Sequence, residues 1–169
     1  KPLGFGTITT ALKQQRVREE DLAAAVQWMA RLNRDASQVG VACGVRSATD
    51  ITGFSFLGHS LEMAQASKVA FHFFFDRIPI LENAYLYATQ YIFPGGAYDN
   101  RAYFHQKVRL ERELGEDSQM LLYDPQTSGG LLLAVPHDHC PEFESLMAER
   151  NAPAWRVGDV IEGEGIILS

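Results

Sequence analysis

An aromatic segment near the middle of the chain reads Val69-Ala70-Phe71-His72-Phe73-Phe74-Phe75. Its β-branched and aromatic residues favour an extended strand. Side chains alternate between the two faces of a strand, and here both faces are apolar except at His72. Two apolar faces are typical of a strand that is covered on both sides. We therefore expect this strand to lie in a sheet with packed helices, and His72 to be packed or hydrogen-bonded at the edge of the core.

Helices and strands are predicted on both sides of this segment, in irregular alternation. Apolar spacing predicts helices over 19–33, 51–67, 81–91 and 138–150, with further helices expected at 35–45 and 100–110. Strands are expected at 3–9, 120–123 and 130–135, with a closing hairpin of 155–161 and 165–168. This pattern predicts an α/β (α+β) fold, a mixed sheet with packed helices, in a single domain over residues 1–169.

The composition argues against several classes of partner. The chain has 169 residues, of which 46% are hydrophobic, enough for a sizeable core, and a formal net charge of -6. Nucleic-acid and anionic membrane surfaces both require a concentrated basic patch, which this chain lacks. No apolar run reaches the roughly 18 residues of a membrane span, and no secretory signal follows Lys1. Cys43 and Cys140 lie far apart, as expected for free thiols in a reducing, cytoplasmic setting.

The first candidate site is Thr49-Asp50-Ile51-Thr52-Gly53-Phe54, where a loop is predicted to become a helix. The carboxylate of Asp50 can face a phosphate-bound Mg²⁺ there, because a hard cation takes oxygen ligands. A helix N-terminus offers N–H groups to an anion, and Gly53 allows close approach of the backbone. The alternative is that Asp50 or Thr52 is the N-cap of the helix, and the spacing alone favours that alternative.

The second candidate site is Pro94-Gly95-Gly96-Ala97-Tyr98-Asp99-Asn100. Paired glycines such as Gly95 and Gly96 permit positive φ and can form an amide nest for an anion. The alternative is a surface loop with a helix cap at Asn100, since glycine and proline are common loop residues.

The third candidate site is Asp124-Pro125-Gln126-Thr127-Ser128-Gly129-Gly130, which leads into the apolar run Leu131-Leu132-Leu133. These polar residues and glycines could form the polar edge of a binding cleft. They could equally form a tight connection whose hydroxyls and amide satisfy nearby backbone groups. The spacing does not match a Walker A loop, because no Gly-Lys-Ser/Thr sequence occurs.

The group His137-Asp138-His139-Cys140 resembles a metal cluster in composition only. Residues two apart on a helix do not share a face, so these side chains cannot converge locally. We expect an exposed first helical turn there.

The three candidate sites, in this order and with this spacing, closely resemble the selenophosphate synthetase (selenide, water dikinase) family. The opening Lys1-Pro2-Leu3-Gly4 resembles the start of that family's C-terminal domain. The wider superfamily includes aminoimidazole ribonucleotide synthetase, thiamine-monophosphate kinase and a hydrogenase-maturation protein. The resemblance implies a PurM-like C-terminal half of a two-domain enzyme that converts selenide, ATP and water to selenophosphate, AMP and phosphate.

The resemblance also implies how the work is divided between the two halves. The missing N-terminal domain would supply the reactive Cys or selenocysteine, so no catalytic residue is expected in this chain, which alone would be inactive. Asp50 aligns with an aspartate that helps to hold Mg²⁺ on the phosphates of ATP. A homodimer is implied for the full-length protein. The positions matched to nucleotide binding are Thr52, Gly53, Gly95, Gly96, Asn100, Gln126, Thr127, Ser128, Gly129 and Gly130.

One residue departs from the family pattern. The family has Gly-Phe-Gly where this chain has Gly53-Phe54-Ser55, and we expect Ser55 in the interior of the helix. The departure indicates a fused or divergent homologue and keeps a non-catalytic scaffold or dimerisation module as an alternative. A further alternative is an ATP-dependent enzyme of the same superfamily with a different substrate.

Overall fold

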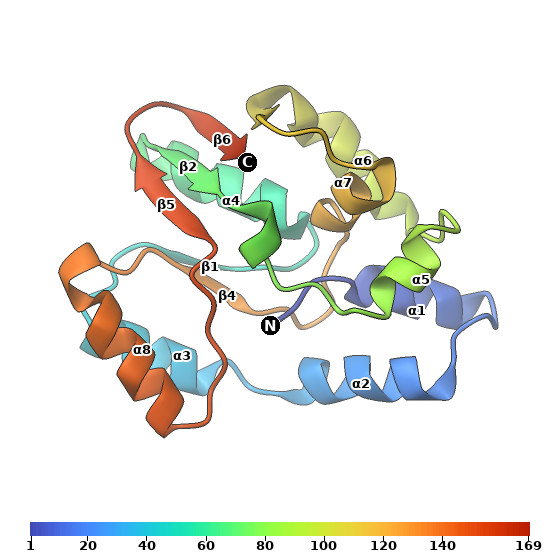
Figure 1. Cartoon of the computed structure of the whole chain (residues 1–169), viewed down its shortest axis with the longest axis horizontal. Helices are drawn as coiled ribbons and strands as arrows, with labels where there is room; N and C mark the ends of the chain where they lie inside the picture. Colours follow the sequence, from blue (N-terminus) through green and yellow to red (C-terminus); the bar gives the residue numbers. More distant parts are fainter.

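The computed structural model describes residues 1–169 as eight α-helices and six strands (Figure 1). The helices are α1 (Phe5–Lys13), α2 (Glu19–Ala30), α3 (Arg34–Ala42), α4 (Ser55–Ser67), α5 (Ala84–Ala88), α6 (Gly95–Phe104), α7 (Glu116–Leu122) and α8 (Cys140–Glu149). The strands are β1 (Ala48–Asp50), β2 (Ala70–Phe73), β3 (Val108–Leu110), β4 (Leu131–Leu133), β5 (Gly158–Ile161) and β6 (Gly165–Leu168). None of the helices has the length and apolar character of a membrane span.

The strands form two separate sheets. The larger sheet has the order β3-β6-β2-β5, and the smaller one pairs β1 with β4. Within the larger sheet β2 is antiparallel to β5 and parallel to β6. In the smaller, antiparallel sheet Thr49 lies opposite Leu132. Mixed pairing combined with packed helices confirms the predicted fold class.

Helix α4 covers one face of the larger sheet. Phe71 and Phe73 of β2 are buried on this side, and the ring of Phe56 in α4 lies 4.7 Å from that of Phe73, centroid to centroid. The opposite face is only half-covered at His72 and Phe74, because the main helical contact to β2 comes from α4. The expectation of a strand covered on both sides therefore holds for the α4 face, while the opposite face is buried at Ala70 and only partly exposed at His72 and Phe74.

His72 itself behaves as the sequence predicts. Its side chain is half-buried, at the boundary between the core and the partly exposed face of the sheet. Its Nε2 lies 2.9 Å from Oγ of Ser169, which is hydrogen-bonding distance.

Two further apolar clusters lie apart from this one, the first on the right of Figure 1 and the second at its lower left. One joins α1, α2, α5 and α7 around Phe5, Ile8 and Met120. The other joins α3 and α8 through Val39, Phe143 and neighbouring residues. The helices pack as three groups around the two sheets, and the smaller sheet lies between them (Figure 1).

Five of the six helix predictions are confirmed, although the ends of the helices are shifted. The helices predicted over 19–33, 35–45, 51–67, 81–91 and 138–150 correspond to α2, α3, α4, α5 and α8. The strands predicted at 69–75 and 130–135 correspond to β2 and β4. The helix predicted over 100–110 overlaps α6, which begins earlier at Gly95, and its last three residues are β3 instead.

Three predictions of local structure are wrong. Residues 3–9 lie mostly in helix α1, and 120–123 in helix α7, rather than in strands. Residues 155–161 and 165–168 do not form a hairpin, because β2 lies between β5 and β6 and pairs with both. The short connection at Gly163 instead passes Ala70, the first residue of β2: a Cβ placed on Gly163 would lie 3.6 Å from the Ala70 Cβ.

Helix α1 begins at a buried clamp that is supplied by a distant part of the chain. The first N–H groups of a helix have no partner within the helix. Here the amide oxygen of Gln126 accepts hydrogen bonds from the N–H groups of Gly4 and Phe5, at 3.1 and 3.2 Å. The carboxylate of Asp124 accepts from the Gly6 N–H and from the Thr7 hydroxyl, both at 2.9 Å.

Asp124 is fully buried in this clamp. Burial raises the pKa of its carboxyl to about 7, against the opposing effect of the hydrogen bonds from Thr7, Gln126 and Gly6. No cation pairs with it, so its desolvation is offset by the hydrogen bonds and by the raised pKa, which favours the neutral carboxyl. This four-bond arrangement explains why residues 3–9, which look extended in sequence, form a helix.

Helix α4 begins with a strained residue. Ser55 is fully buried and has a φ of 68°, in the left-handed region that favours glycine. Its hydroxyl accepts a hydrogen bond of 3.4 Å from the Gly58 N–H, which partly caps the helix. The expectation of an ordinary position inside the helix is wrong, since Ser55 is the first residue of α4.

Replacing Asp124 with asparagine is expected to destabilise the chain in a pH-dependent way. An amide NH₂ at the Oδ2 position would face two donors, the Gly6 N–H and the Gln126 amide, and at the Oδ1 position it would need the Thr7 hydroxyl to turn and accept, at a cost of about 1–3 kcal/mol. The folded-state pKa of Asp124 lies above its unfolded value, so its contribution is complete below about pH 4 and is lost as pH rises through 7. The difference in unfolding free energy between wild type and Asp124→Asn, measured by urea denaturation, should therefore shrink from pH 5 to pH 8. A difference that is constant with pH would contradict the buried, protonated carboxyl.

Two substitutions at Ser55 should separate strain from capping. Ser55→Gly relieves the left-handed strain of about 1 kcal/mol and loses only a long hydrogen bond, so it should leave stability unchanged or raise it. Ser55→Ala keeps the strain and removes the cap, and should cost about 1–2 kcal/mol. Thermal denaturation of the two variants against wild type checks this order: if the hydroxyl mattered more than the φ angle, Ser55→Gly would also melt below wild type.

Candidate functional site

The three sequence motifs meet at one place in the structure. The Gln126 N–H donates to the Thr52 carbonyl at 2.9 Å, and the Ile51 N–H donates to the Gly130 carbonyl at 2.8 Å. The side-chain amide of Asn100 donates to the carbonyls of Gly53 and Tyr123, at 3.0 and 3.1 Å. Segments that are 23 to 79 positions apart are thus joined directly by hydrogen bonds.

Asp50 lies at the end of β1, opposite Leu131. Its side chain is exposed, and no hydrogen bond or ion pair engages its carboxylate. Helix α4 begins only at Ser55, and the residue before it, Phe54, supplies no side-chain cap. The alternative that Asp50 or Thr52 is the N-cap of this helix is therefore wrong.

The residues around Asp50 fit a magnesium ion only as part of a larger site. Nowhere in the structure do three or more His, Cys, Asp or Glu side chains come together to hold a metal. A phosphate-bound Mg²⁺ keeps several waters and needs only one or two carboxylates from the protein. The free oxygens of Asp50 match that requirement for a single carboxylate ligand.

The turn between Asp50 and α4 is fixed by His59. Its Nε2 lies 3.0 Å from the Thr52 hydroxyl and accepts a 3.2 Å hydrogen bond from the Phe54 N–H. A nitrogen that accepts from a backbone N–H carries no proton, so the proton of the neutral ring lies on Nδ1, 3.1 Å from the Glu62 carboxylate. The sequence alone does not distinguish His59 from a surface histidine; its position seven residues after Thr52, one helical turn into α4, is the signal that identifies it.

Gly95 and Gly96 of the second motif are the first two residues of a helix and do not lie in a loop. Helix α6 begins at Gly95, and Pro94 lies at its N-cap position. Cβ atoms on Gly53 and Gly95 would meet nothing within 4 Å, so the backbone at both positions is open to a neighbour. Asn100 is not a cap: it lies inside α6, is buried, and joins the turn at Gly53 to Tyr123.

Most residues of the third motif make hydrogen bonds or close backbone contacts with distant parts of the chain. The Gln126 side chain belongs to the α1 clamp, and the Ser128 hydroxyl donates to the Met29 carbonyl at 2.9 Å. A Cβ on Gly129 would lie 1.9 Å from the Ile51 carbonyl oxygen, and a Cβ on Gly130 would lie 2.5 Å from the Lys1 nitrogen. Only glycine permits these two close approaches.

Thr127 is the exception within the third motif. It is exposed, and its hydroxyl makes no hydrogen bond within the chain. The structure therefore divides the matched positions into two groups. The open group contains Asp50, Gly53, Gly95 and Thr127, with Thr52 and Gly96 half-buried beside it. The holding group contains Asn100, Gln126, Ser128, Gly129 and Gly130.

The segment His137–Cys140 lies apart from these motifs, in a short 3₁₀ turn that leads into α8. Nδ1 of His139 lies 3.1 Å from the Glu142 carboxylate. The His137 side chain is 86% exposed. The segment is therefore an exposed helical turn, and its side chains do not converge as metal ligands.

Known proteins resemble the chain along its whole length. Residues 1–169 match the family described as AIR synthase related protein, C-terminal domain. A selenide, water dikinase from Pseudomonas aeruginosa is 39% identical over 168 residues, which are 99% of this chain and 48% of the relative. One from Caldanaerobacter subterraneus subsp. tengcongensis is 42% identical over 164 residues, which are 96% of this chain and 47% of the relative. The chain spans about half the length of these relatives.

The fold also matches solved structures. The hydrogenase maturation protein HypE in complex with ATP gives a TM-score of 0.60 at 16% identity, over 95% of this chain and 40% of that one. At this identity the likeness concerns the fold alone. Because the family match covers every residue, the chain belongs to the AIR synthase related protein, C-terminal domain family.

Proposed function

We propose that this chain is the C-terminal domain, over residues 1–169, of a selenide, water dikinase, and that it helps to bind Mg–ATP. The full-length enzyme would convert selenide, ATP and water to selenophosphate, AMP and phosphate. The observation that carries the proposal is the meeting of three distant motifs beside the unpaired carboxylate of Asp50. Relatives named selenide, water dikinase that are 37 to 42% identical to this chain support the choice of reaction.

The residues would act in two ways. Asp50 would hold Mg²⁺, while the backbone at Gly53, Gly95 and Gly96 and the hydroxyls of Thr52 and Thr127 would face the phosphates. The N–H groups of Gly95 and Gly96, at the start of α6, suit an anion because they have no partner within the helix, whereas the Ala97 N–H already donates to the Pro94 carbonyl.

The buried residues would position this surface rather than touch the nucleotide. Asn100 holds the Gly53 carbonyl, and Gln126 holds the Thr52 carbonyl through its backbone N–H. Ser128, Gly129 and Gly130 fix the loop that carries Thr127. When bound, Mg²⁺ would neutralise part of the phosphate charge.

A second candidate is an ATP-dependent enzyme of the same superfamily that acts on another substrate. It is favoured by the fold likeness to a HypE structure determined with ATP. The open surface around Asp50 is common to both candidates, because nothing in it is specific for selenide. Formation of AMP that depends on selenide, in the full-length protein, decides between them.

The remaining parts of the proposal concern the whole protein. Its N-terminal domain would supply the reactive cysteine or selenocysteine, and two copies would form a homodimer. A cytoplasmic location agrees with Cys43 and Cys140, both of which are free thiols.

Replacing Asp50 with asparagine in the full-length protein should lower selenide-dependent AMP formation on the order of 100-fold, since a metal contributes several kcal/mol of charge stabilisation. The carboxylate makes no contact within the chain, so thermal stability should not change measurably. Asp138→Asn, at a fully exposed carboxylate of the 3₁₀ turn, is the matched control and should retain wild-type turnover. Wild-type activity in Asp50→Asn would remove Asp50 from the metal site.

The isolated chain should form no AMP from selenide and ATP. Its open surface offers one carboxylate and a few backbone donors, which is half a site. Calorimetric titration with Mg–ATP should show appreciable binding only when the N-terminal domain is present. Turnover by the isolated chain would contradict the division between the two domains, and equal binding with and without the N-terminal domain would indicate a complete site here.

A further inference from the structure

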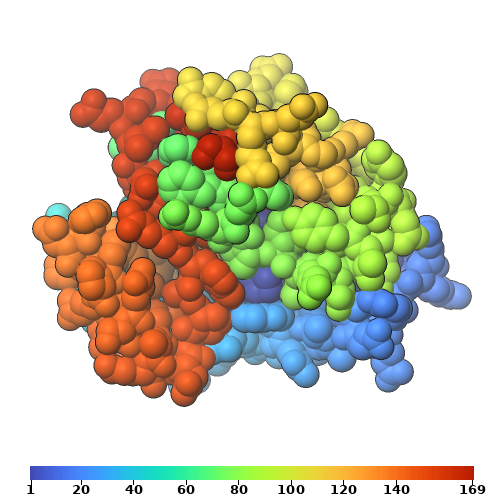
Figure 2. Space-filling view, in the orientation of Figure 1, coloured from blue at the N-terminus to red at the C-terminus, as the bar shows by residue number.

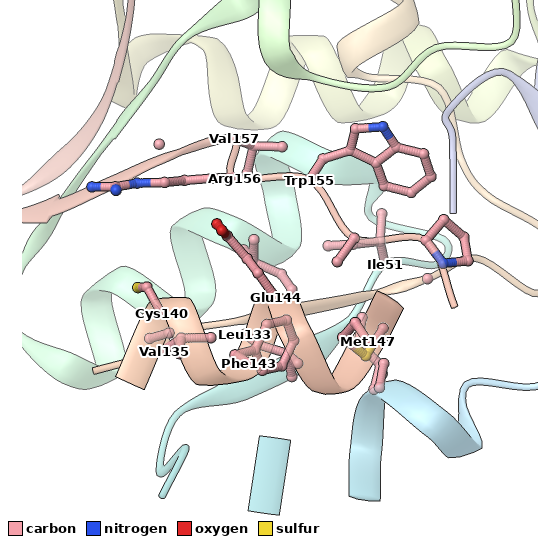
Figure 3. Close-up of a pocket in the computed structure, with 18 of the residues that line it drawn as sticks. Ile51, Leu133, Val135, Cys140, Phe143, Glu144, Met147, Trp155, Arg156 and Val157 are labelled. Atoms are coloured by element: carbon pink, nitrogen blue, oxygen red, sulfur yellow. The ribbon is translucent and has the colours of Figure 1, made fainter. Parts of the chain in front are cut away.

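A groove of about 1340 Å³ separates the two sheets. It runs between β4 and α8 on one side and the segment from Trp155 to Val160 on the other (Figure 3). In the space-filling view the surface is hollowed beside α8, which is orange (Figure 2). Sites for single small ligands measure about 300–1,000 Å³. The groove is larger than such a site, so its size favours a longer occupant.

Two free strand edges line this groove. Alternate residues of an antiparallel strand bond to its partner and the others point away. The bonds from Ile51 N–H to Gly130 and from Ala134 N–H to Ser47 show that Leu131 and Leu133 direct their N–H and C=O groups away from β1.

The edge of β5 is free in the same way. The bond from the Phe74 N–H to the Val157 carbonyl shows that Gly158 and Val160 direct their backbone groups away from β2. Leu131, Leu133, Gly158 and Val160 all line the groove. A row of unpaired N–H and C=O groups is a template for another strand, and here two rows open onto one space.

The walls of the groove are mainly apolar on both faces that such a strand would present, although the Glu144 side chain of α8 extends into the groove in Figure 3. On β4, Leu132 and Ala134 pack toward the core beneath α4, and Leu133 and Val135 pack toward α3 and α8. In Figure 3 Phe143 and Met147 of α8 lie below the groove and Val157 lies above it. Of its 41 lining residues, 23 are hydrophobic. The occupant should therefore be an extended segment that is apolar on both faces, as β4 is.

Lys1 lies at one end of the groove. A Cβ on Gly130 would be 2.5 Å from the Lys1 nitrogen, so the chain passes directly beside the start of β4. Polypeptide that led into Lys1 along the groove would run antiparallel to β4.

We propose that the polypeptide preceding Lys1 in the full-length protein forms an extended strand in this groove, pairs with both β4 and β5, and joins the two sheets into one. The chain covers only about half the length of its relatives, so such polypeptide is available in proteins of this family. The strand would be antiparallel to β4 and would lead directly through Lys1 into the clamp at α1. The inference does not depend on the proposed reaction or on nucleotide binding.

Amide hydrogen exchange in the full-length protein tests the proposal. The N–H groups of Leu131, Leu133, Gly158 and Val160 should exchange at least about 100-fold more slowly than that of Leu110, on the free edge of β3, because paired amides exchange only on opening. Protection should be the same with and without Mg–ATP. Rapid exchange on either edge would overturn the proposal, as would protection that is lost on dilution, which would indicate a second copy in the groove.

A cysteine pair then tests the identity of the strand. With Lys1 beside Gly130, the second residue before Lys1 lies opposite Leu132, at a spacing that permits a disulfide. In the full-length protein with Cys140→Ser, Leu132→Cys should cross-link to a cysteine at that second position. A cysteine at the third position, on the other face, is the control and should not cross-link. Protected amides without the expected cross-link would show that a different segment fills the groove, and the proposal would be wrong.

Discussion

The buried carboxylate of Asp124 is the constraint on which the rest of the structure depends. It lies in the interior with no cation, where an unpaired charge is costly. Its solvation comes from the Gly6 N–H, the Thr7 hydroxyl and the Gln126 amide. Every one of these donors must be in place before the carboxyl can be buried, so α1 and the loop after Asp124 have to form together.

Backbone hydrogen bonds connect this clamp to the segment that carries Asp50. The Gln126 N–H fixes the Thr52 carbonyl, and Gly130 accepts from Ile51. Asp50 directly precedes Ile51 in the chain and is the last residue of β1, which pairs with β4. The position of the exposed carboxylate is therefore determined by buried groups that have no direct contact with it. If this surface binds phosphates as proposed, such support leaves little reorganisation for the moment of binding.

The sequence predicts those parts of the fold whose pattern is long and periodic. Helices α2, α4 and α8 have clear apolar spacing, and the aromatic alternation at β2 is unambiguous. Short apolar segments fail because four to seven residues satisfy both helix and strand patterns. Residues 120–123 read as a strand, yet they end α7, where packing against α5 decides the outcome. The false hairpin fails for another reason: no local pattern shows that β2 inserts between two adjacent strands.

The candidate site is predictable as a set of residues but not as a set of roles. Sequence similarity treats Gln126 and Thr127 alike, although one is buried in the clamp and the other is exposed and free. His59, which fixes the turn after Asp50, has no distinguishing local pattern. Burial and hydrogen-bond partners, which depend on residues far along the chain, separate contact residues from positioning residues.

Ser55 shows how this separation bears on function. A serine where the family has glycine suggests a lost contact with a ligand, and with it a scaffold rather than an enzyme. In the structure Ser55 is fully buried and keeps the left-handed φ that glycine would adopt. Its hydroxyl faces the Gly58 N–H within α4, so it neither reaches the open surface nor changes the path of the turn. The consequence of the serine is strain at the start of a helix, which lowers stability and leaves the surface around Asp50 as it would be with glycine.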